Sequence, residues 1–220
     1  MPILTRMTEQ KRRPNRRNIY LDGRFAFGVN LNVVAQFHLK PGLELSVQQV
    51  QSIQLGEVRQ ECMDKALRCL ERRLHSRHEL QVRLTRLEYG PEVIEQVLNE
   101  LQRLGYVDDE RFARTKALSA AQHKHHGKRR AMVELIKAGV ARTTADRALE
   151  KVYDVHDSLT TARQLAQKKA PSLRQLDSMT ARRRLAGMLL RRGFDYDTVR
   201  PVIDEVLGDE PPQDSSDHSD

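Results

Sequence analysis

Apolar residues recur along most of this chain at spacings of three and four, in a pattern that nearly repeats three times with a period of about fifty residues. The three copies come into register when Glu88, Gly139 and Gly193 are superposed. Apolar positions then lie at helical spacing on both sides, which predicts two amphipathic helices joined by a sharp corner. The aligned sets are Leu80, Ala131 and Leu185; Leu84, Leu135 and Leu189; Tyr89, Val140 and Phe194; Ile94, Ala145 and Val199; Leu98, Leu149 and Ile203; and Leu101, Val152 and Val206.

The distance between successive corners leaves room for a third helix in each copy. Segments 64–74, 110–122 and 158–169 fit that role. Such units bury their apolar faces against each other and against their neighbours. The sequence therefore predicts a mainly α-helical protein with three tandem three-helix repeats, at 58–108, 109–156 and 157–207, stacked as an elongated solenoid.

The first 57 residues follow a different pattern. Asp22-Gly23 separates two short runs, 18–21 and 24–28, in which apolar side chains alternate with others. Asp-Gly is the strongest short hairpin signal because both turn positions need positive φ. Short helices at 31–37 and 46–55 are expected to follow. The sequence therefore predicts a small basic αβ module with a β-hairpin at residues 1–57.

Composition excludes several classes of protein. The chain has no Trp, 5% aromatic and 31% charged residues, which fits thin helical cores with much solvated surface. No apolar run approaches the roughly 18 residues of a membrane span, and charges occupy the N-terminus where a signal peptide is apolar. Cys62 and Cys69 would lie about 10.5 Å apart along a helix, too far for a disulfide. We expect a cytoplasmic protein with reduced cysteines and no membrane partner.

Charge is unevenly distributed. The chain has 38 Lys and Arg against 30 Asp and Glu, a net charge of +8. Residues 208–220 hold five of the acids together with prolines and serines, so they are expected to form an acidic, disordered tail. The remainder is therefore more basic than the whole. Such a body attracts polyanions, either nucleic acid or an acidic protein groove.

The basic residues are clustered. Any one cluster is equally well explained as a solvated helix face, but the last three occur near the same helix of successive repeats and could form one stripe. The clusters are Lys11, Arg12, Arg13, Arg16 and Arg17 before the hairpin; Arg72, Arg73 and Arg77 in the first repeat; Lys128, Arg129 and Arg130 in the second; and Arg182, Arg183, Arg184, Arg191 and Arg192 in the third.

Helix capping accounts for two polar motifs. Asp108-Asp109 lies between a helix that ends at Gly105 and one that begins near Glu110, where Asp can accept from free amides. Ser76 and Glu79 have the spacing of a capping box. A direct contact of Asp108-Asp109 with a partner is the less favoured alternative.

Other motifs also favour structural roles. Tyr89, Tyr106, Phe112 and Phe194 fall on apolar positions and are expected in the core, with base stacking as the less favoured alternative. The histidines at 123, 125 and 126 have no Cys or carboxylate at a supporting spacing, so a basic loop is favoured over a metal site. Pro201 falls inside the last expected helix, which should either start late, near Asp197, or kink.

Several stretches carry a family resemblance. They are residues 66–80 (Ala-Leu-Arg-Cys-Leu-Glu-Arg-Arg-Leu-His-Ser-Arg-His-Glu-Leu), 105–113 (Gly-Tyr-Val-Asp-Asp-Glu-Arg-Phe-Ala), 127–130 with 134–135, and 189–194 (Leu-Leu-Arg-Arg-Gly-Phe). In this order, across roughly 60–207, they resemble the RecX family of bacterial regulators of the RecA recombinase. The basic hairpin module looks like the extension of longer family members. Glu88 stands where the family usually has glycine, so the first corner is expected to be built differently.

The resemblance implies a non-enzymatic modulator with no cofactor or metal. It would be a curved rod that lodges in the groove of the RecA filament on single-stranded DNA. A monomer is expected separately, because nothing in the repeat array supplies a long exposed seam for dimerisation. Family members oppose filament growth or promote disassembly, which restrains strand exchange, ATP hydrolysis and coprotease activity. Weak binding of single-stranded DNA is expected as well, with double-stranded DNA left open.

The resemblance supplies no residue roles, so the candidate contacts rest on charge placement. The N-terminal cluster is assigned a secondary basic contact. The candidates for filament or DNA binding are Arg72, Arg73, Arg77, Lys128, Arg129, Arg130, Arg183, Arg184, Arg191 and Arg192.

Two other classes of protein are alternatives. The sequence has no phosphate-cradling Gly-Lys-Ser or Gly-Lys-Thr loop, no Gly-x-Ser-x-Gly elbow and no dinucleotide fingerprint, which disfavours an enzyme. A general DNA- or RNA-binding helical protein would have the same electrostatics. Such a protein would differ from a specific regulator in one respect, because it would affect recombinase activity only at protein concentrations high enough to coat the DNA.

Overall fold

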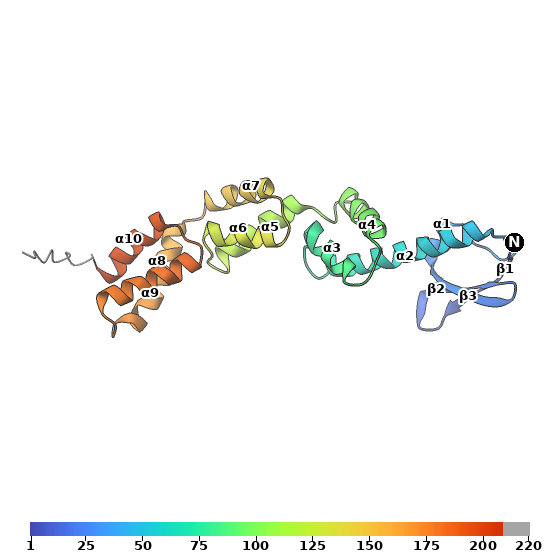
Figure 1. Cartoon of the computed structure of the whole chain (residues 1–220), viewed down its shortest axis with the longest axis horizontal. Coiled ribbons are helices and arrows are strands. Elements are labelled where there is room, and N and C mark those ends of the chain that lie inside the picture. Colours follow the sequence, from blue (N-terminus) through green and yellow to red (C-terminus); the bar gives the residue numbers. More distant parts are fainter. Residues whose placement is uncertain (209–220) are drawn as a thin grey trace, which may run out of the picture. The chain divides into compact units, whose positions relative to one another are not determined.

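The computed structural model describes residues 1–208, and the chain divides into two compact units, Met1–Asp108 and Asp109–Asp220, called here the first and second units. Figure 1 shows a small sheet followed by helices. Apart from Gly208, the predicted acidic tail lies outside the described residues. None of the helices within residues 1–208 is long and apolar enough to cross a membrane.

The first unit begins with an antiparallel sheet in the order β1-β2-β3 (Figure 1). The predicted hairpin is confirmed, because Leu21 pairs with Arg24 across Asp22 and Gly23, whose φ angles are 48° and 78°. The first strand was not predicted, since its side chains are mostly polar and only Leu4 is fully buried. The strands are β1 (Leu4–Gln10), β2 (Arg13–Leu21) and β3 (Arg24–Asn30).

Helices α1 (Leu31–Gln36) and α2 (Val47–Leu70) follow the sheet. The prediction of separate helices at 46–55 and 64–74 was wrong, because α2 is continuous through Gly56. A Cβ at Gly56 would lie 2.8 Å from the Phe37 ring, so this glycine allows close packing and does not end the helix. The proposed boundary after residue 57 lies inside α2, and independent folding of residues 1–57 stays a prediction.

The rest of the first unit is a three-helix repeat built from the second half of α2 with α3 (Arg77–Thr85) and α4 (Pro91–Arg103). Its core contains Cys62, Leu80, Leu84 and Leu98, all fully buried. Both cysteines are free, and Cys69 packs at the edge of this core, as predicted. Ser76 caps α3, since its hydroxyl accepts from the Glu79 amide at 3.0 Å.

The second unit holds two more three-helix repeats. The third helix predicted for each is confirmed in α5 and α8, within one residue of the expected bounds. The helices are α5 (Asp109–Gln122), α6 (Lys128–Lys137) and α7 (Arg142–Tyr153), then α8 (Ser158–Lys169), a 3-10 turn η1 (Ala170–Leu173), α9 (Ser178–Arg191) and α10 (Tyr196–Leu207).

The three corners have one geometry. Glu88, Gly139 and Gly193 have φ angles of 63°, 77° and 90°. The next amide in each case donates back to the helix: Tyr89 to Leu84, Val140 to Leu135 and Phe194 to Leu189, at 3.5, 3.1 and 3.3 Å. The repeat alignment is therefore confirmed. The expectation of a differently built first corner was wrong, because Glu88 takes the same left-handed conformation with its side chain exposed.

The aromatic and proline predictions had mixed outcomes. Phe112 and Phe194 are buried, and Tyr89 packs against the core of the first unit. Tyr106 is 56% exposed, so its core assignment was wrong; Val107, 3% exposed, takes the inward position after the turn. Helix α10 begins at Tyr196, as far past its corner as α4 and α7 are past theirs, and contains Pro201. The start predicted near Asp197 is therefore confirmed within one residue, although it is not late relative to the other two repeats.

Candidate nucleic-acid interface

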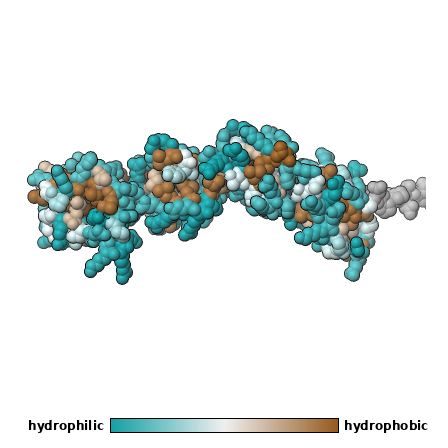
Figure 2. Space-filling model, turned by 180° about the vertical axis from the view of Figure 1, so that it is seen from behind, coloured by the Kyte–Doolittle hydropathy of each residue, from teal (hydrophilic) through white to brown (hydrophobic). Residues whose placement is uncertain are grey.

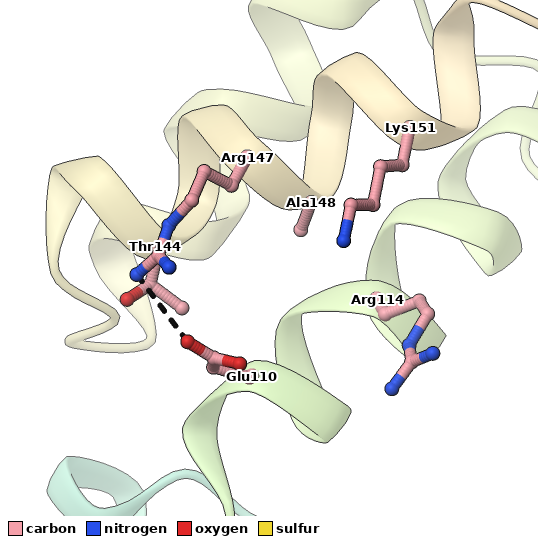
Figure 3. Close-up of a pocket in the computed structure, with 6 residues that line it drawn as sticks. All are labelled: Glu110, Arg114, Thr144, Arg147, Ala148 and Lys151. Carbon is pink, nitrogen blue, oxygen red and sulfur yellow. Dashed lines mark ion pairs between the residues drawn. The ribbon is translucent and has the colours of Figure 1, made fainter.

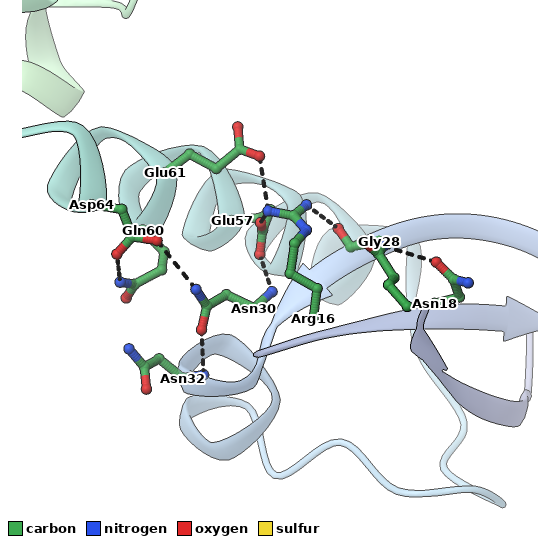
Figure 4. Close-up of polar contacts among 10 residues, drawn as sticks. Arg16, Asn18, Gly28, Asn30, Asn32, Glu57, Gln60, Glu61 and Asp64 are labelled. Carbon is green, nitrogen blue, oxygen red and sulfur yellow. Dashed lines mark hydrogen bonds and ion pairs between the residues drawn. The ribbon is translucent and has the colours of Figure 1, made fainter. Parts of the chain in front are cut away.

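Part of the N-terminal basic cluster has a structural role (Figure 4). The Arg16 guanidinium contacts Glu57 at 2.7 Å and Glu61 at 3.0 Å, while the Glu57 carboxylate accepts from the Asn30 amide at 2.6 Å. Burial raises the pKa of Glu57, and the Asn30 hydrogen bond and the Arg16 charge oppose that rise. Arg16 thus fastens the sheet to α2.

The other members of this N-terminal cluster differ in whether their side chains are available to contact a partner. Arg17 donates to the Pro14 carbonyl at 2.7 Å and lies 3.6 Å from Glu9. Lys11, Arg12 and Arg13 are exposed at and beside the turn between β1 and β2. The predicted secondary contact is therefore best represented by residues 11–13.

The first-repeat cluster is divided in a similar way. Arg77 contacts α4 through Glu95 at 2.6 Å and Asn99 at 3.0 Å, and also through Gln102. Arg73 pairs with Glu79 at 2.6 Å, whereas Arg72 is exposed. Arg77 positions α3 against α4, which makes it a weaker candidate for a partner contact than Arg72.

The start of α6 contacts the end of α9 directly, backbone to backbone. The Gly127 amide donates to the Arg192 carbonyl at 2.8 Å, and the Arg129 amide donates to the Gly193 carbonyl at 3.2 Å. A helix start has free amides and a helix end has free carbonyls, so this junction satisfies both. The contact is so close that a Cβ at Gly127 would lie 2.2 Å from the Gly193 oxygen.

This junction brings two predicted clusters together in the second unit. Lys128, Arg129 and Arg130 are exposed at the start of α6, and Arg191 is exposed at the end of α9. Arg192 is half-buried and donates to the Lys124 carbonyl at 3.1 Å. The clusters are about sixty residues apart in the sequence, yet their helix ends touch.

The loop before α6 is fixed by a carboxylate. Glu134 contacts Lys124 at 2.9 Å and His126 at 3.1 Å. Burial acts to raise the pKa of Glu134, but the Lys124 hydrogen bond and the nearby positive charges lower it overall. Burial lowers the pKa of His126, while the nearby Glu134 carboxylate acts to raise it. The Tyr153 hydroxyl donates to the His126 carbonyl at 2.6 Å.

A basic hollow of about 430 Å³ lies beside α9. Its lining contains no carboxylate, and within residues 1–208 its four cationic side chains have neither an ion-pair nor a hydrogen-bond partner. They are Lys169, Arg183, Arg184 and Arg191, joined by Ser172, Leu173 and Met188. Arg182, on the same helix, instead pairs with Asp204 and donates to the Gly208 carbonyl at 2.5 Å.

Lys169 and Ser172, which line this hollow, were not among the contacts predicted from the sequence. The Lys168-Lys169 pair at the end of the predicted 158–169 helix was the available signal, but that helix had been assigned only to the core. Folding η1 back beside α9 brings Lys169 to the arginines.

These positions can contact phosphates without reading bases. Arg and Lys side chains hold phosphate oxygens, and such contacts carry no sequence information. No aromatic side chain lines the hollow, so base stacking is not available there. Figure 2 shows a mostly hydrophilic surface on the visible face.

Four models of RecX domains match this chain. The regulatory protein RecX N-terminal domain matches residues 2–46, and the first, second and third three-helix domains match 62–101, 108–149 and 156–203. A solved structure described as a crystal structure of regulatory protein RecX shares the fold, with a TM-score of 0.77 and 23% identity over 93% of this chain and 100% of the other.

Curated relatives agree with these matches. The regulatory protein RecX of Bacillus subtilis is 29% identical over 94% of this chain and 78% of its own, and that of Clostridioides difficile is 28% identical over 94% and 97%. The regulatory protein RecX of Pelodictyon phaeoclathratiforme is 33% identical over 64% of this chain and 86% of its own. With all four RecX domains matched in order, this chain belongs to the RecX family.

Proposed function

We propose that this protein is a non-enzymatic, cytoplasmic regulator of the RecA recombinase that binds in the groove of the RecA filament on single-stranded DNA. Its binding opposes filament growth or promotes disassembly, and so restrains strand exchange, ATP hydrolysis and coprotease activity. Membership of a family of regulatory proteins supports the regulatory role. The resemblance noted in the sequence supplies the recombinase as the partner.

The observation that carries this proposal is the basic surface of the second unit. The α6–α9 junction places the 128–130 cluster beside Arg191 and Arg192, and the hollow along α9 adds Lys169, Arg183 and Arg184. A basic surface attracts an anionic filament, and this binding weakens as salt rises, because each neutralised phosphate releases a counterion. Several repeats that bind one assembly together gain affinity through effective concentration.

The test reverses charge in separate places. One variant carries Lys128→Glu, Arg129→Glu and Arg130→Glu, and a second carries Arg183→Glu, Arg184→Glu and Arg191→Glu. Both should inhibit RecA ATP hydrolysis on single-stranded DNA much less than the wild type does. A control that reverses Lys11, Arg12 and Arg13 should lose less. Equal inhibition by all four proteins would reject this surface.

A general nucleic-acid-binding protein is the second candidate, supported by the cationic lining of the hollow beside α9, which can hold the phosphates of any sequence. Titrating the wild type against recombinase activity separates the two candidates. Inhibition well below the level that coats the DNA supports a filament regulator. Inhibition that needs stoichiometric coating of bare strands supports simple competition for DNA.

A further inference from the structure

A second basic hollow lies between α5 and α7, and none of its residues belongs to the predicted clusters (Figure 3). Its volume is about 100 Å³, well above the roughly 10–15 Å³ that a cavity needs to hold one water molecule. The α7 residues are spaced so that they share one helix face directed toward α5. The lining residues are Glu110 and Arg114 of α5, and Thr144, Arg147, Ala148 and Lys151 of α7.

The charges in this hollow are unbalanced. Arg147 lies 3.3 Å from Glu110, but the two side chains are 63% and 67% exposed, and such surface pairs are weak. Arg114 and Lys151 have no hydrogen-bond or ion-pair partner within residues 1–208. Figure 3 shows them on the side of the hollow away from the Glu110–Arg147 pair. Three cations therefore surround one carboxylate, and two of them are uncommitted.

The lining suits a phosphate. Arg presents a planar fork of N–H donors, Lys adds three rotatable donors, and the Thr144 hydroxyl can donate from the same helix face. Ala148 is the only apolar residue of the lining, so an apolar peptide side chain would find little to pack against. No aromatic side chain is present to stack on a base.

We propose that the α5–α7 hollow binds one backbone phosphate of single-stranded DNA, with Arg114, Lys151 and Arg147 as the cationic contacts. This assignment deepens the proposed function and rests on it for the identity of the DNA. The phosphate would displace the exposed Glu110 from Arg147 and add two charge-assisted hydrogen bonds that the free protein lacks.

The experiment measures binding of a fluorescently labelled single-stranded oligonucleotide by anisotropy at several salt concentrations, with the full-length protein. Arg114→Ala with Lys151→Ala should lower affinity at least about fivefold, because hydrogen bonds to charged groups are lost. Losing one phosphate contact should also reduce the slope of log affinity against log salt by about 0.7. Arg114→Lys with Lys151→Arg should recover much of the affinity.

The matched control removes the same charge from the same unit. Lys137→Ala with Arg200→Ala changes exposed residues of α6 and α10 that lie outside both hollows. It should keep affinity within about twofold and leave the salt slope unchanged. Equal losses in the two double variants, or a wild type that does not bind the oligonucleotide, would overturn the phosphate assignment. Circular dichroism checks that both variants remain folded.

A parallel assay of RecA ATP hydrolysis separates this assignment from the proposed function. If Arg114→Ala with Lys151→Ala loses inhibition but binds bare DNA like the wild type, the hollow binds a protein carboxylate and the phosphate assignment is wrong. If it loses DNA affinity as expected while the wild type does not inhibit RecA, the hollow is a phosphate site and the proposed function fails.

Discussion

Gly193→Ala should be far more damaging than a glycine substitution at a comparable helix end. Gly193 follows α9 at φ 90°, and a Cβ there would lie 2.3 Å from the Arg130 amide nitrogen. Gly105, which follows α4 at φ 74°, has no atom within 4 Å of such a Cβ. The two substitutions share the backbone strain and differ in the close approach of α6.

The magnitudes follow from these geometries. Left-handed backbone costs about 1–2 kcal/mol for alanine, and reduced freedom of the unfolded chain offsets about 0.4–1 kcal/mol, so Gly105→Ala should cost about 1 kcal/mol. Gly193→Ala adds an overpacking cost of about 1–3 kcal/mol. Opening the junction would also leave the Gly127 and Arg129 amides without their carbonyls, at about 1–3 kcal/mol each if they stay buried. The backbone strain and the overpacking together come to about 2–4 kcal/mol, and amides left unpaired in an opened junction would add to that cost.

Urea unfolding followed by circular dichroism measures this difference. Gly193→Asn is a useful companion, since Asn tolerates the left-handed region but still carries a Cβ. It should recover little stability if the close approach dominates. Folded Gly193→Ala should also bind single-stranded DNA more weakly, although no charge has changed, because the two basic clusters separate. A cost for Gly193→Ala no larger than that for Gly105→Ala would refute the reasoning.

Three further predictions concern single groups. Burial raises the pKa of the Cys62 thiol to about 11. An aromatic disulfide reagent should therefore label the partly exposed Cys69 quickly in the folded protein, and the buried Cys62 only when the protein unfolds. Cys69→Ser should remove the fast phase of this reaction. The hydrogen bond from Thr198 lowers the pKa of Asp195. The folding stability that the ionised Asp195 contributes is therefore present above about pH 4 and is lost as pH falls through the lowered pKa. Asp195→Asn should keep the helix cap, and its free energy of unfolding, measured over a series of pH values, should fall less at acid pH than that of the wild type. Asp195→Ala should lower the free energy of unfolding by about 1 kcal/mol at neutral pH. Glu88→Gly should stabilise the first unit by up to about 1 kcal/mol in urea unfolding, since it relieves left-handed strain; a destabilised variant would contradict this account of the corner.

The local features of the fold were predictable because short-range patterns determine them. Asp22-Gly23 marked the hairpin, and helical periodicity on both sides of Gly139 and Gly193 marked the corners. Superposition on these glycines also placed Glu88 at a corner, where the residue type argued against the left-handed backbone that the structure shows. Periodicity was thus a better guide to that corner than residue identity, because the packing of the flanking helices fixes the turn.

The candidate site was only partly predictable. Charge clusters can be read from the sequence, but a guanidinium that binds a neighbouring helix looks the same there as one that faces solvent. Arg16 and Arg77 proved to be structural because Glu57 and Glu95 approach them in space. The cations of the α5–α7 hollow were missed because they are scattered along two helices and form no run.

The sequence by itself determined the helices, the repeat and the positive charge, because periodicity, turn chemistry and composition act over a few residues. Only the tertiary structure decided which charges are available. Helix packing joins the start of α6 to the end of α9, folds Lys169 beside Arg183, and pairs other arginines with carboxylates. These contacts link residues far apart in the chain, and their geometry depends on how whole helices pack, which no local pattern records.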